Sequence, residues 1–326
     1  CGEVSLFGQE YRGCNPLCWV QGRRIPVQVK DGSLAQLSDA SSLSTGYYLS
    51  QNCSRNRLRR PLPCRGKKDW RENEMRLTRH NGRAGKHGTY NPKHNDRSFD
   101  LENSEHINAE LAKKNVYWDC YNGFRSLAKE ELLADTFEEV EEMFYSSQYR
   151  NHVESQNQRN EKNRHPERNR TTSDLLKNKK TAPEETIFQI GTIDNHVPPE
   201  ILLQVVTDFL VELDTRFGKN VHILDWALHL DEGTPHIHER HVFDCENSYG
   251  EVAPQQEKAL EELGFELPDP TQKPSKINNR KKTFDSVCRV ILFNITKKYG
   301  LDLEEEPEYG GRAYLEKQDY ILMKQK

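Results

Sequence analysis

Residues His229–His238 (HLDEGTPHIH) place three histidines and two carboxylates around a Gly-x-Pro turn. Imidazole nitrogens are ligands for divalent transition metals, and nearby carboxylates commonly complete or orient such sites. In a strand, His236 and His238 project from the same face because they are two residues apart, whereas Ile237 points to the opposite face. His229 precedes the turn and would come opposite them in an antiparallel hairpin. The spacing therefore predicts one metal site with His229, His236 and His238 as ligands.

The two carboxylates of the turn are expected to support this site. Asp231 is interpreted as a further metal ligand, and Glu232 as a catalytic residue that can also orient an imidazole. The arrangement is not the metalloprotease motif HExxH, which needs both histidines on one helix. A polar surface cluster is the alternative interpretation. It explains five such residues within ten positions less well than a shared ion does.

The segments that must position the histidines show regular periodicity. Strands are expected at 221–230 and 236–244, on either side of the turn, and at 186–191. Between them, Pro198 and Pro199 open a helix whose apolar residues recur every three or four positions until Gly218 ends it. The remaining expected elements are helices at 104–114, 126–147 and 281–298, a strand at 115–121, and a flexible glycine-containing loop at 76–90. Together they predict an α/β fold in which helices pack on a sheet.

Composition limits the class of protein. Apolar residues make up 34% of the 326 residues and charged residues 30%, so a core is expected over part of the chain. The apolar runs are far shorter than the ~20 residues of a membrane-spanning helix, which argues against membrane insertion. Five of the 8 cysteines fall in the first 64 residues, unlike a secreted disulfide framework. With no recognisable signal peptide, a cytoplasmic protein is expected.

Charge is unevenly distributed along a chain whose net charge is −4. Residues 54–93 contain 13 Lys or Arg and 3 Asp or Glu, and residues 159–180 contain 8 Lys or Arg interleaved with asparagines. Each segment can be a solvated surface or a contact for a nucleic-acid backbone. Trp118 and Tyr121 are expected in the core rather than as platforms for base stacking.

The pattern HxDExxPHxH at 229–238 resembles the third motif of the MobV relaxases, the Pre/Mob plasmid mobilisation and recombination enzymes of the HUH endonuclease superfamily. The resemblance covers roughly residues 76–322 and is most specific in this motif. It implies a HUH relaxase-like fold, with helices packed on an antiparallel sheet. It further implies an enzyme that nicks and rejoins one DNA strand at a plasmid or mobile-element transfer origin. It also implies a divalent ion, Mn²⁺ or Mg²⁺, and single-stranded or hairpin origin DNA as partner, together with other mobilisation or coupling proteins.

Relaxases of this family also carry a motif HNxR whose histidine is the nucleophile, and this chain has it twice, at 80–83 (HNGR) and 94–97 (HNDR). The resemblance therefore implies His80 or His94 as catalytic residue. A neutral imidazole can attack phosphorus near pH 7, where a tyrosine needs a base, and the product is a 5′-phosphohistidine adduct. Arg83 or Arg97 could then hold the scissile phosphate.

Spacing alone does not choose between the two copies. The family continues with an Asn-x-Asp element and a helix near a triplet matched by 106–108 (HIN). We favour His80, because residues 91–96 can then supply the Asn/Asp element, whereas His94 would have to use 99–101 (FDL). We therefore expect His80 to lie nearer than His94 to the three histidines.

The same interpretation divides the chain. Residues 1–70 are expected to be a poorly ordered N-terminal segment outside the natural domain, and 71–253 to form the relaxase catalytic domain, with 148–185 as a polar arm or insertion. Residues 254–326 are expected to form a helical C-terminal extension that is truncated at its end.

Two other functions stay open at this stage. One is a HUH rolling-circle replication initiator or transposase, but its catalytic tyrosine would follow the histidine strand, and Tyr299, Tyr309 and Tyr320 lie in no two-tyrosine helical motif. The other is a non-catalytic origin-binding plasmid protein. Metal-dependent nicking of origin DNA distinguishes it from the enzymes.

Overall fold

The computed structural model describes residues 74–85, 88–99, 107–126 and 135–304, and the short strands at 5–6, 9–10, 19–20 and 23–24. Residues Trp19–Asp69 separate from the rest as a unit of their own. Most of the predicted N-terminal segment, Asp100, His106, Tyr309, Tyr320 and the end of the predicted C-terminal extension therefore lie outside the described residues. No described helix is long and apolar enough to cross a membrane.

A seven-stranded sheet organises the described residues, and every neighbouring pair of its strands is antiparallel. In spatial order the strands are β5 (Leu77–Gly82), β10 (Glu184–Ile190), β12 (His236–Glu246), β11 (Val221–His229), β8 (Val116–Asp119) and β9 (Gly123–Ser126), and β13 (Val252–Pro254) pairs with the end of β12. The predicted α/β fold with an antiparallel sheet is confirmed. The central hairpin β11–β12 carries the metal-site motif.

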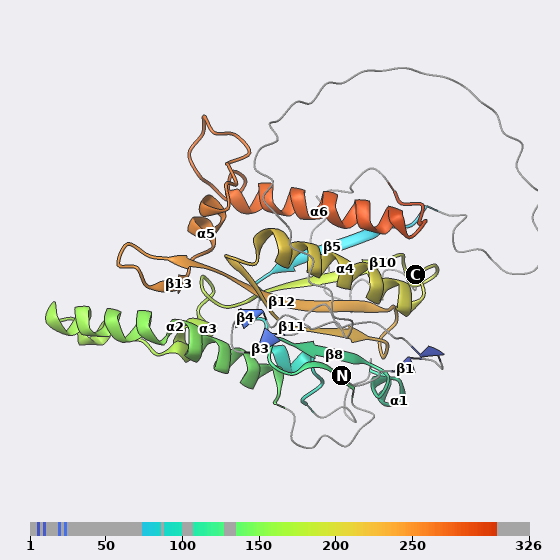
Figure 1. Ribbon diagram of the computed structural model, residues 1–326, viewed down its shortest axis with the longest axis horizontal. Helices are drawn as coiled ribbons and strands as arrows, with labels where there is room; N and C mark the ends of the chain where they lie inside the picture. The colour runs from blue at the N-terminus through green and yellow to red at the C-terminus, as the bar shows by residue number, and fades with distance from the viewer. Residues whose placement is uncertain are drawn as a thin grey trace, which may run out of the picture. The chain divides into compact units, whose positions relative to one another are not determined.

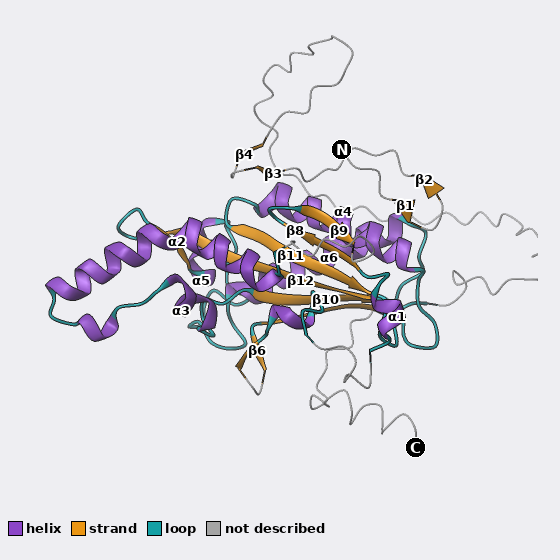
Figure 2. Cartoon of the chain, turned by 90° about the horizontal axis from the view of Figure 1, so that it is seen from below, coloured by secondary structure: helices purple, strands orange, loops and turns teal. Residues whose placement is uncertain are grey.

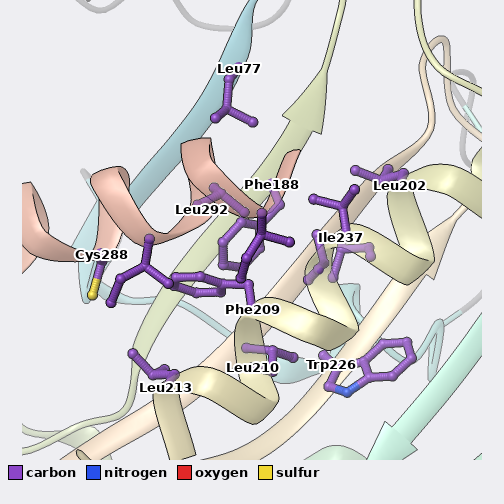
Figure 3. Packing of buried hydrophobic residues seen from close by; sticks show 14 of the residues in the cluster. Leu77, Phe188, Leu202, Phe209, Leu210, Leu213, Trp226, Ile237, Cys288 and Leu292 are labelled. Atoms are coloured by element: carbon purple, nitrogen blue, oxygen red, sulfur yellow. The ribbon is translucent and has the colours of Figure 1, made fainter. Parts of the chain in front are cut away.

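One face of the sheet is covered by α4 (Pro199–Phe217) and α6 (Arg280–Lys298) (Figure 1). Helix α4 begins at a proline, and its buried apolar residues recur at helical spacing, so that one stripe faces the sheet. Phe209 of α4, Leu292 of α6, and Phe188 and Ile237 of the sheet meet in the core (Figure 3). This apolar layer holds the strands in place on the face of the sheet opposite the histidines.

The opposite face carries α2 (Phe137–Lys162). It begins with a capping box, in which Thr136 and Glu139 satisfy each other's backbone N–H groups. Its first half buries Phe137, Tyr145 and Tyr149 against the sheet. Its second half extends beyond the sheet and returns through η2 (Pro166–Arg168) and α3 (Thr172–Lys177), forming the predicted polar arm (Figure 2).

The arm is anchored by the turn between β12 and β13. Arg159 donates to both carboxylate oxygens of Glu251, at 2.6 and 2.9 Å, and lies 4.1 Å from the ring centroid of Tyr249. His152 also contacts Glu251, at 3.3 Å. Arg159 is therefore engaged by the protein, whereas the residues at the tip, 161–168, are exposed.

The remaining elements are short or lie at the sheet margins. They are β1 (Ser5–Leu6), β2 (Gln9–Glu10), β3 (Trp19–Val20), β4 (Arg23–Arg24), β6 (Ala84–Gly85), β7 (Gly88–Thr89), η1 (Pro92–His94), α1 (Ala109–Ala112) and α5 (Gln256–Glu262). Helices α5 and α6 lie in the predicted C-terminal extension and pack into the same core as α4. The boundaries of the predicted segments stay a prediction.

Three expectations for local structure were wrong. The predicted loop at 76–90 contains the edge strand β5, which forms because its backbone pairs with β10 along six residues despite a basic, glycine-containing sequence. The predicted helix at 104–114 is reduced, in the described residues, to the single turn of α1. Tyr121 is 42% exposed, whereas Trp118 is buried, as expected, and stacks on Trp226.

Candidate active site

The hairpin β11–β12 places the motif histidines on the α2 face of the sheet. His229 and His236 are directly paired across the hairpin, and His238 is paired with Ala227, so all three side chains share one face. Ile237 is fully buried in the core on the other face. The alternation expected from the sequence is therefore present.

A β-bulge in β11 is needed for His229 to reach this face. The register shifts between Ile223 and Asp225, which leaves Leu224 as an extra residue. Before the bulge, even-numbered His222 faces α2 and packs on Phe144. After it, odd-numbered residues face α2, because a one-residue shift exchanges the two faces of a strand. Without the bulge, His229 would point into the apolar core.

The three imidazole rings are nearly equidistant. Their ring centroids are 5.2 Å apart for His229–His236, 4.9 Å for His229–His238 and 5.0 Å for His236–His238. An ion about 2.1 Å from one nitrogen of each ring, at tetrahedral angles, would hold the ring centres roughly 5 Å apart. The ring spacing matches that of a shared ion, whereas the ligand atoms of the three rings do not all lie within 4.8 Å of one another.

Each ring also has one nitrogen directed at an oxygen of the protein. His229 Nε2 lies 2.8 Å from the carbonyl of Asn95, His236 Nδ1 lies 2.7 Å from the carbonyl of Thr234, and His238 Nδ1 lies 3.0 Å from Glu185 Oε1. In the neutral imidazole that nitrogen is the donor, and the other nitrogen carries the lone pair that binds an ion. This pattern orients metal-binding histidines.

His229 gives the most direct evidence that the cluster fits an ion. Its Nδ1 atom is buried and has no hydrogen-bond partner among the described residues. Burial, followed by the nearby His238 and Arg97, lowers the pKa of His229 well below its ordinary value, which keeps the ring neutral. A buried polar atom without a partner is costly, and coordination to a cation would satisfy it.

Glu185 of β10 fixes His238 from behind. Burial alone would raise its pKa, but the hydrogen bond with His238, together with Arg240 and Asn95, lowers it to about 2. Its Oε2 atom accepts from Asn95 at 3.1 Å and from Arg240 at 3.4 Å. Arg240 in turn pairs with Glu141 of α2, so the carboxylate also connects the site to that helix. The sequence analysis did not identify this residue.

The two turn carboxylates take different positions. Asp231 accepts from Arg97 Nε and Nη2 through its two oxygens, both at 2.8 Å, so its carboxylate is bound in a two-pronged ion pair. The expectation that Asp231 is a metal ligand is not supported by this geometry. Glu232 Oε1 lies 2.9 Å from Arg97 Nη2 and 4.0 Å from both His229 Nδ1 and His236 Nε2. Glu232 thus borders the histidine cluster directly.

The second HNxR copy, residues 94–97, lies against the cluster. The ring of His94 is 5.5 Å from that of His238 and 5.7 Å from that of His229, between centroids. Its side chain is 45% exposed, and its Nε2 atom lies 3.4 Å from Glu232 Oε1. His94 therefore stands where the buried cluster opens to solvent.

The other residues of this copy hold the site together. Asn95 is fully buried and contacts both His229 and Glu185. Asp96 Oδ2 accepts the backbone N–H of Phe137 at 2.7 Å, at the start of α2. Arg97 adopts φ 59°, a left-handed conformation uncommon for residues other than glycine, and its side chain reaches inward to Asp231.

The first HNxR copy lies at the edge strand instead. His80 is paired with Ile187, which is paired with His238, so His80 faces the same side roughly 10 Å from His238 between strand backbones. No ring contact joins His80 to the cluster among the described residues. Arg83 donates to the carbonyl of Lys180 at 3.4 Å. The expectation that His80 lies nearer the cluster than His94 is wrong, because β5 is separated from β12 by β10.

Two overlapping groups of described residues have ligand atoms close enough to hold one ion. One contains His94, His229 and His238, and the other His229, Glu232 and His236. His229 belongs to both groups, whereas His236 and His238 fall in different groups, so no single group of described residues contains all three predicted ligands. Asn108, from the predicted 106–108 triplet, caps α1 and donates its backbone N–H to the carbonyl of Asp231 at 2.9 Å.

No protein-family model and no curated protein sequence matches this chain. Comparison with solved structures returns Mn-bound crystal structures of the MobM relaxase domain (MOBV; Mob_Pre) in complex with plasmid pMV158 oriT DNA. Two of them, at pH 4.6 and pH 6.8, share 14% identity with a TM-score of 0.41, covering 77% of this chain and 100% and 99% of theirs. A third, at pH 5.5, shares 15% identity with a TM-score of 0.39.

The family printed for these structures, MOBV, is the one whose third motif the 229–238 pattern resembles.

Proposed function

We propose that this chain is a relaxase-type DNA strand transferase that nicks and rejoins one strand at the transfer origin of a plasmid or mobile element. His94 is the nucleophile in this proposal, and His229, His236 and His238 hold a divalent ion. The observation that carries it is the position of His94, half exposed beside the buried rings of His229 and His238 and in contact with Glu232. A plasmid substrate places the activity in the cytoplasm.

The chemistry requires few groups. A lone pair of the His94 ring attacks phosphorus, the bond to the 3′ oxygen breaks, and the products are a 5′-phosphohistidine and a free 3′ hydroxyl. The phosphorylated ring loses its N–H proton in this step, and the leaving 3′ oxygen takes a proton from solvent water. In the tautomer that carries this proton on Nε2, Glu232 Oε1 accepts it from 3.4 Å, and Arg97 Nη1 lies 3.3 Å from the same nitrogen. Reversal of the same steps rejoins the strand.

Arg97 acts as a positioning residue in this proposal. Its guanidinium is 1% exposed and donates to Asp231, to Glu232 and to the backbone carbonyl of His94. Because these partners occupy its donors, it does not hold the scissile phosphate, as the sequence had suggested. It fixes the nucleophile and the proton acceptor relative to each other, which is a requirement for in-line attack.

A divalent ion held by the three histidines would neutralise the negative charge that develops on the phosphate oxygens. The imidazole-rich ligand set favours Mn²⁺ over Mg²⁺. The direction of each ring's second nitrogen and the partnerless Nδ1 of His229 support these ligands.

The test uses a supercoiled plasmid that carries the DNA flanking the coding sequence of this chain. With Mn²⁺, the purified protein should convert it to open circles and remain bound to the 5′ end. A chelator should stop the reaction. Binding without nicking under all metal conditions would instead indicate a non-catalytic origin-binding protein.

The tyrosine-dependent alternatives gain no support from the described residues. The hydroxyl of Tyr299 donates to Asp208 of α4, on the face opposite the histidine cluster. Mapping the residue that carries DNA would still distinguish them, since a rolling-circle initiator or transposase would be labelled on tyrosine.

A further inference from the structure

A second feature lies beside the edge strand β5, an open groove of about 880 Å³. It is formed by the end of β5, the segment between α3 and β10, the start of α5 and the first turn of α6. Six of the residues that line it are basic and three are acidic. The basic residues are Arg83, Lys179, Lys180, Lys258, Lys281 and Lys282, and the acidic residues are Glu184, Glu257 and Asp285. We call this feature the basic groove.

Three of the lysines are exposed and have no acidic partner among the described residues, while Lys258 donates to the backbone carbonyl of Glu246. Lys281 is neutralised on the floor of the groove, since it pairs with both Glu184 and Asp285 at 2.5 Å. By contrast, Lys179, Lys180 and Lys282 are exposed, and no carboxylate in the described part of the chain lies within ion-pair distance of them. Their charges are therefore available to a ligand.

The wall of the groove adds further positive character. Arg83 places its Nε atom in a buried position with no hydrogen-bond partner among the residues described. Helix α6 begins at the groove, with Asn279 as its N-cap, and the N-terminal end of a helix carries partial positive charge. Arg280, the next residue, is neutralised by ion pairs with Glu257 and Glu261.

The basic groove lies at the edge of the sheet on the α6 face, opposite the face that carries the histidines, and β10 connects the two sites. Glu184 and Glu185 are consecutive residues of β10 and point to opposite faces, so that Glu184 lines the groove while Glu185 contacts His238. Asn81 and Arg83, from the first HNxR copy, line the groove at the end of the edge strand. A DNA strand that leaves the active site and passes around the edge strand β5 would meet these residues.

We propose that the basic groove binds the phosphate backbone of the DNA strand on which the active site acts, and that the first HNxR copy contributes to this surface. The inference rests on the proposed function. Mobile lysines along an open groove suit sequence-independent contact with successive phosphates, whereas a small anion would be expected in an enclosed pocket with convergent polar groups. The duplicated motif then has two roles, since 94–97 builds the active site and 80–83 contacts backbone.

The test measures equilibrium binding of single-stranded origin DNA at several salt concentrations. All proteins carry His94→Ala and are assayed in a chelator, so that no covalent capture occurs. The groove variant replaces Lys179, Lys180 and Lys282 with Gln. The control replaces Lys219, Lys273 and Lys298 with Gln in the same way; these lysines are exposed and do not line the groove.

The groove variant should bind more weakly by roughly tenfold to a hundredfold at about 0.1 M salt, and its slope of log affinity against log salt should fall by about 2, since each lost phosphate contact removes about 0.7. The control should keep the wild-type slope. Equal slopes for the two variants would overturn the inference. Nicking is measured separately on protein with His94 intact. A lack of nicking would refute the proposed function, whereas the salt slopes test the role of the groove independently.

Discussion

Arg97→Gln should strongly destabilise the fold, because it leaves two buried carboxylates without their cation. The Arg97 side chain is 1% exposed, and those of Asp231 and Glu232 are 0% and 6% exposed. Three charge-assisted hydrogen bonds of 2.8, 2.8 and 2.9 Å are lost. Removing one partner of a buried ion pair costs about 3–5 kcal/mol. For a domain of this size, that corresponds to a fall in Tm of roughly 6–20 °C.

The chain supplies a matched control in the first copy of the motif. Arg83→Gln is the same substitution at the same motif position, but Arg83 makes one hydrogen bond of 3.4 Å to a backbone carbonyl. Its loss should change the free energy of unfolding by about 1 kcal/mol or less. The difference in the free energy of unfolding between the two variants therefore measures what the buried contacts of Arg97 contribute.

Urea unfolding in a chelator measures both variants without any contribution from a bound ion. The double variant Arg97→Gln with Asp231→Asn should be less destabilised than the sum of its single variants, because the second change removes the unpaired charge. If Arg97→Gln is no more destabilising than Arg83→Gln, or if the two single effects simply add, the buried pair does not hold the site together and the reasoning is refuted.

Three further outcomes are expected. His236→Ala should abolish nicking while DNA affinity, measured by fluorescence anisotropy, stays nearly unchanged, and nicking at the wild-type rate would contradict the ligand assignment. Mn²⁺ at about 100 times its Kd should raise the free energy of unfolding by about 2.7 kcal/mol, and a gain of the same size in His229→Ala would place the ion elsewhere. Burial alone would raise the pKa of Asp285, but Lys281 and Arg79 lower it below its ordinary 3.8. The Asp285 carboxylate therefore stabilises the fold above that pH, and this stabilisation is lost as the pH falls below it. Asp285→Asn should consequently lose less stability on acidification than the wild type. Equal acid sensitivity of the two proteins would exclude this contribution.

Elements with strong periodicity were predictable from the sequence. The apolar stripe of α4 and the two strands around the Gly-x-Pro turn were placed within two residues of their observed bounds, because local preference and burial agree there. The edge strand β5 was missed since a strand paired on one side only tolerates glycine and charge, so its sequence lacks alternation.

The bulge at Leu224 could not be found from the sequence. The alternation of polar and apolar residues in 221–229 gives no sign of an extra residue. The face on which His229 lies nevertheless depends on the bulge. The hairpin with His236 suggested the correct face only because pairing was assumed to continue from the turn. The register beyond Asp225 is a property of the sheet as a whole.

The choice between the two HNxR copies also depended on tertiary contacts. Their sequences differ in one position, Gly82 in the first and Asp96 in the second. Only Asp96 has a side chain that can accept the N–H at the start of α2, which anchors the second copy beside the cluster. That difference was visible in the sequence, but its meaning required the position of Phe137, 41 residues further along.

Mapping the residue that carries the DNA tests the central proposal most directly. Wild-type protein, His80→Ala and His94→Ala would be incubated with Mn²⁺ and single-stranded origin DNA, and the covalent adduct digested and sequenced by mass spectrometry. We predict an acid-labile phosphohistidine at His94 in the wild type and in His80→Ala, and no adduct in His94→Ala. An adduct on His80, or on a tyrosine such as Tyr90, that persists in His94→Ala would contradict the proposed mechanism.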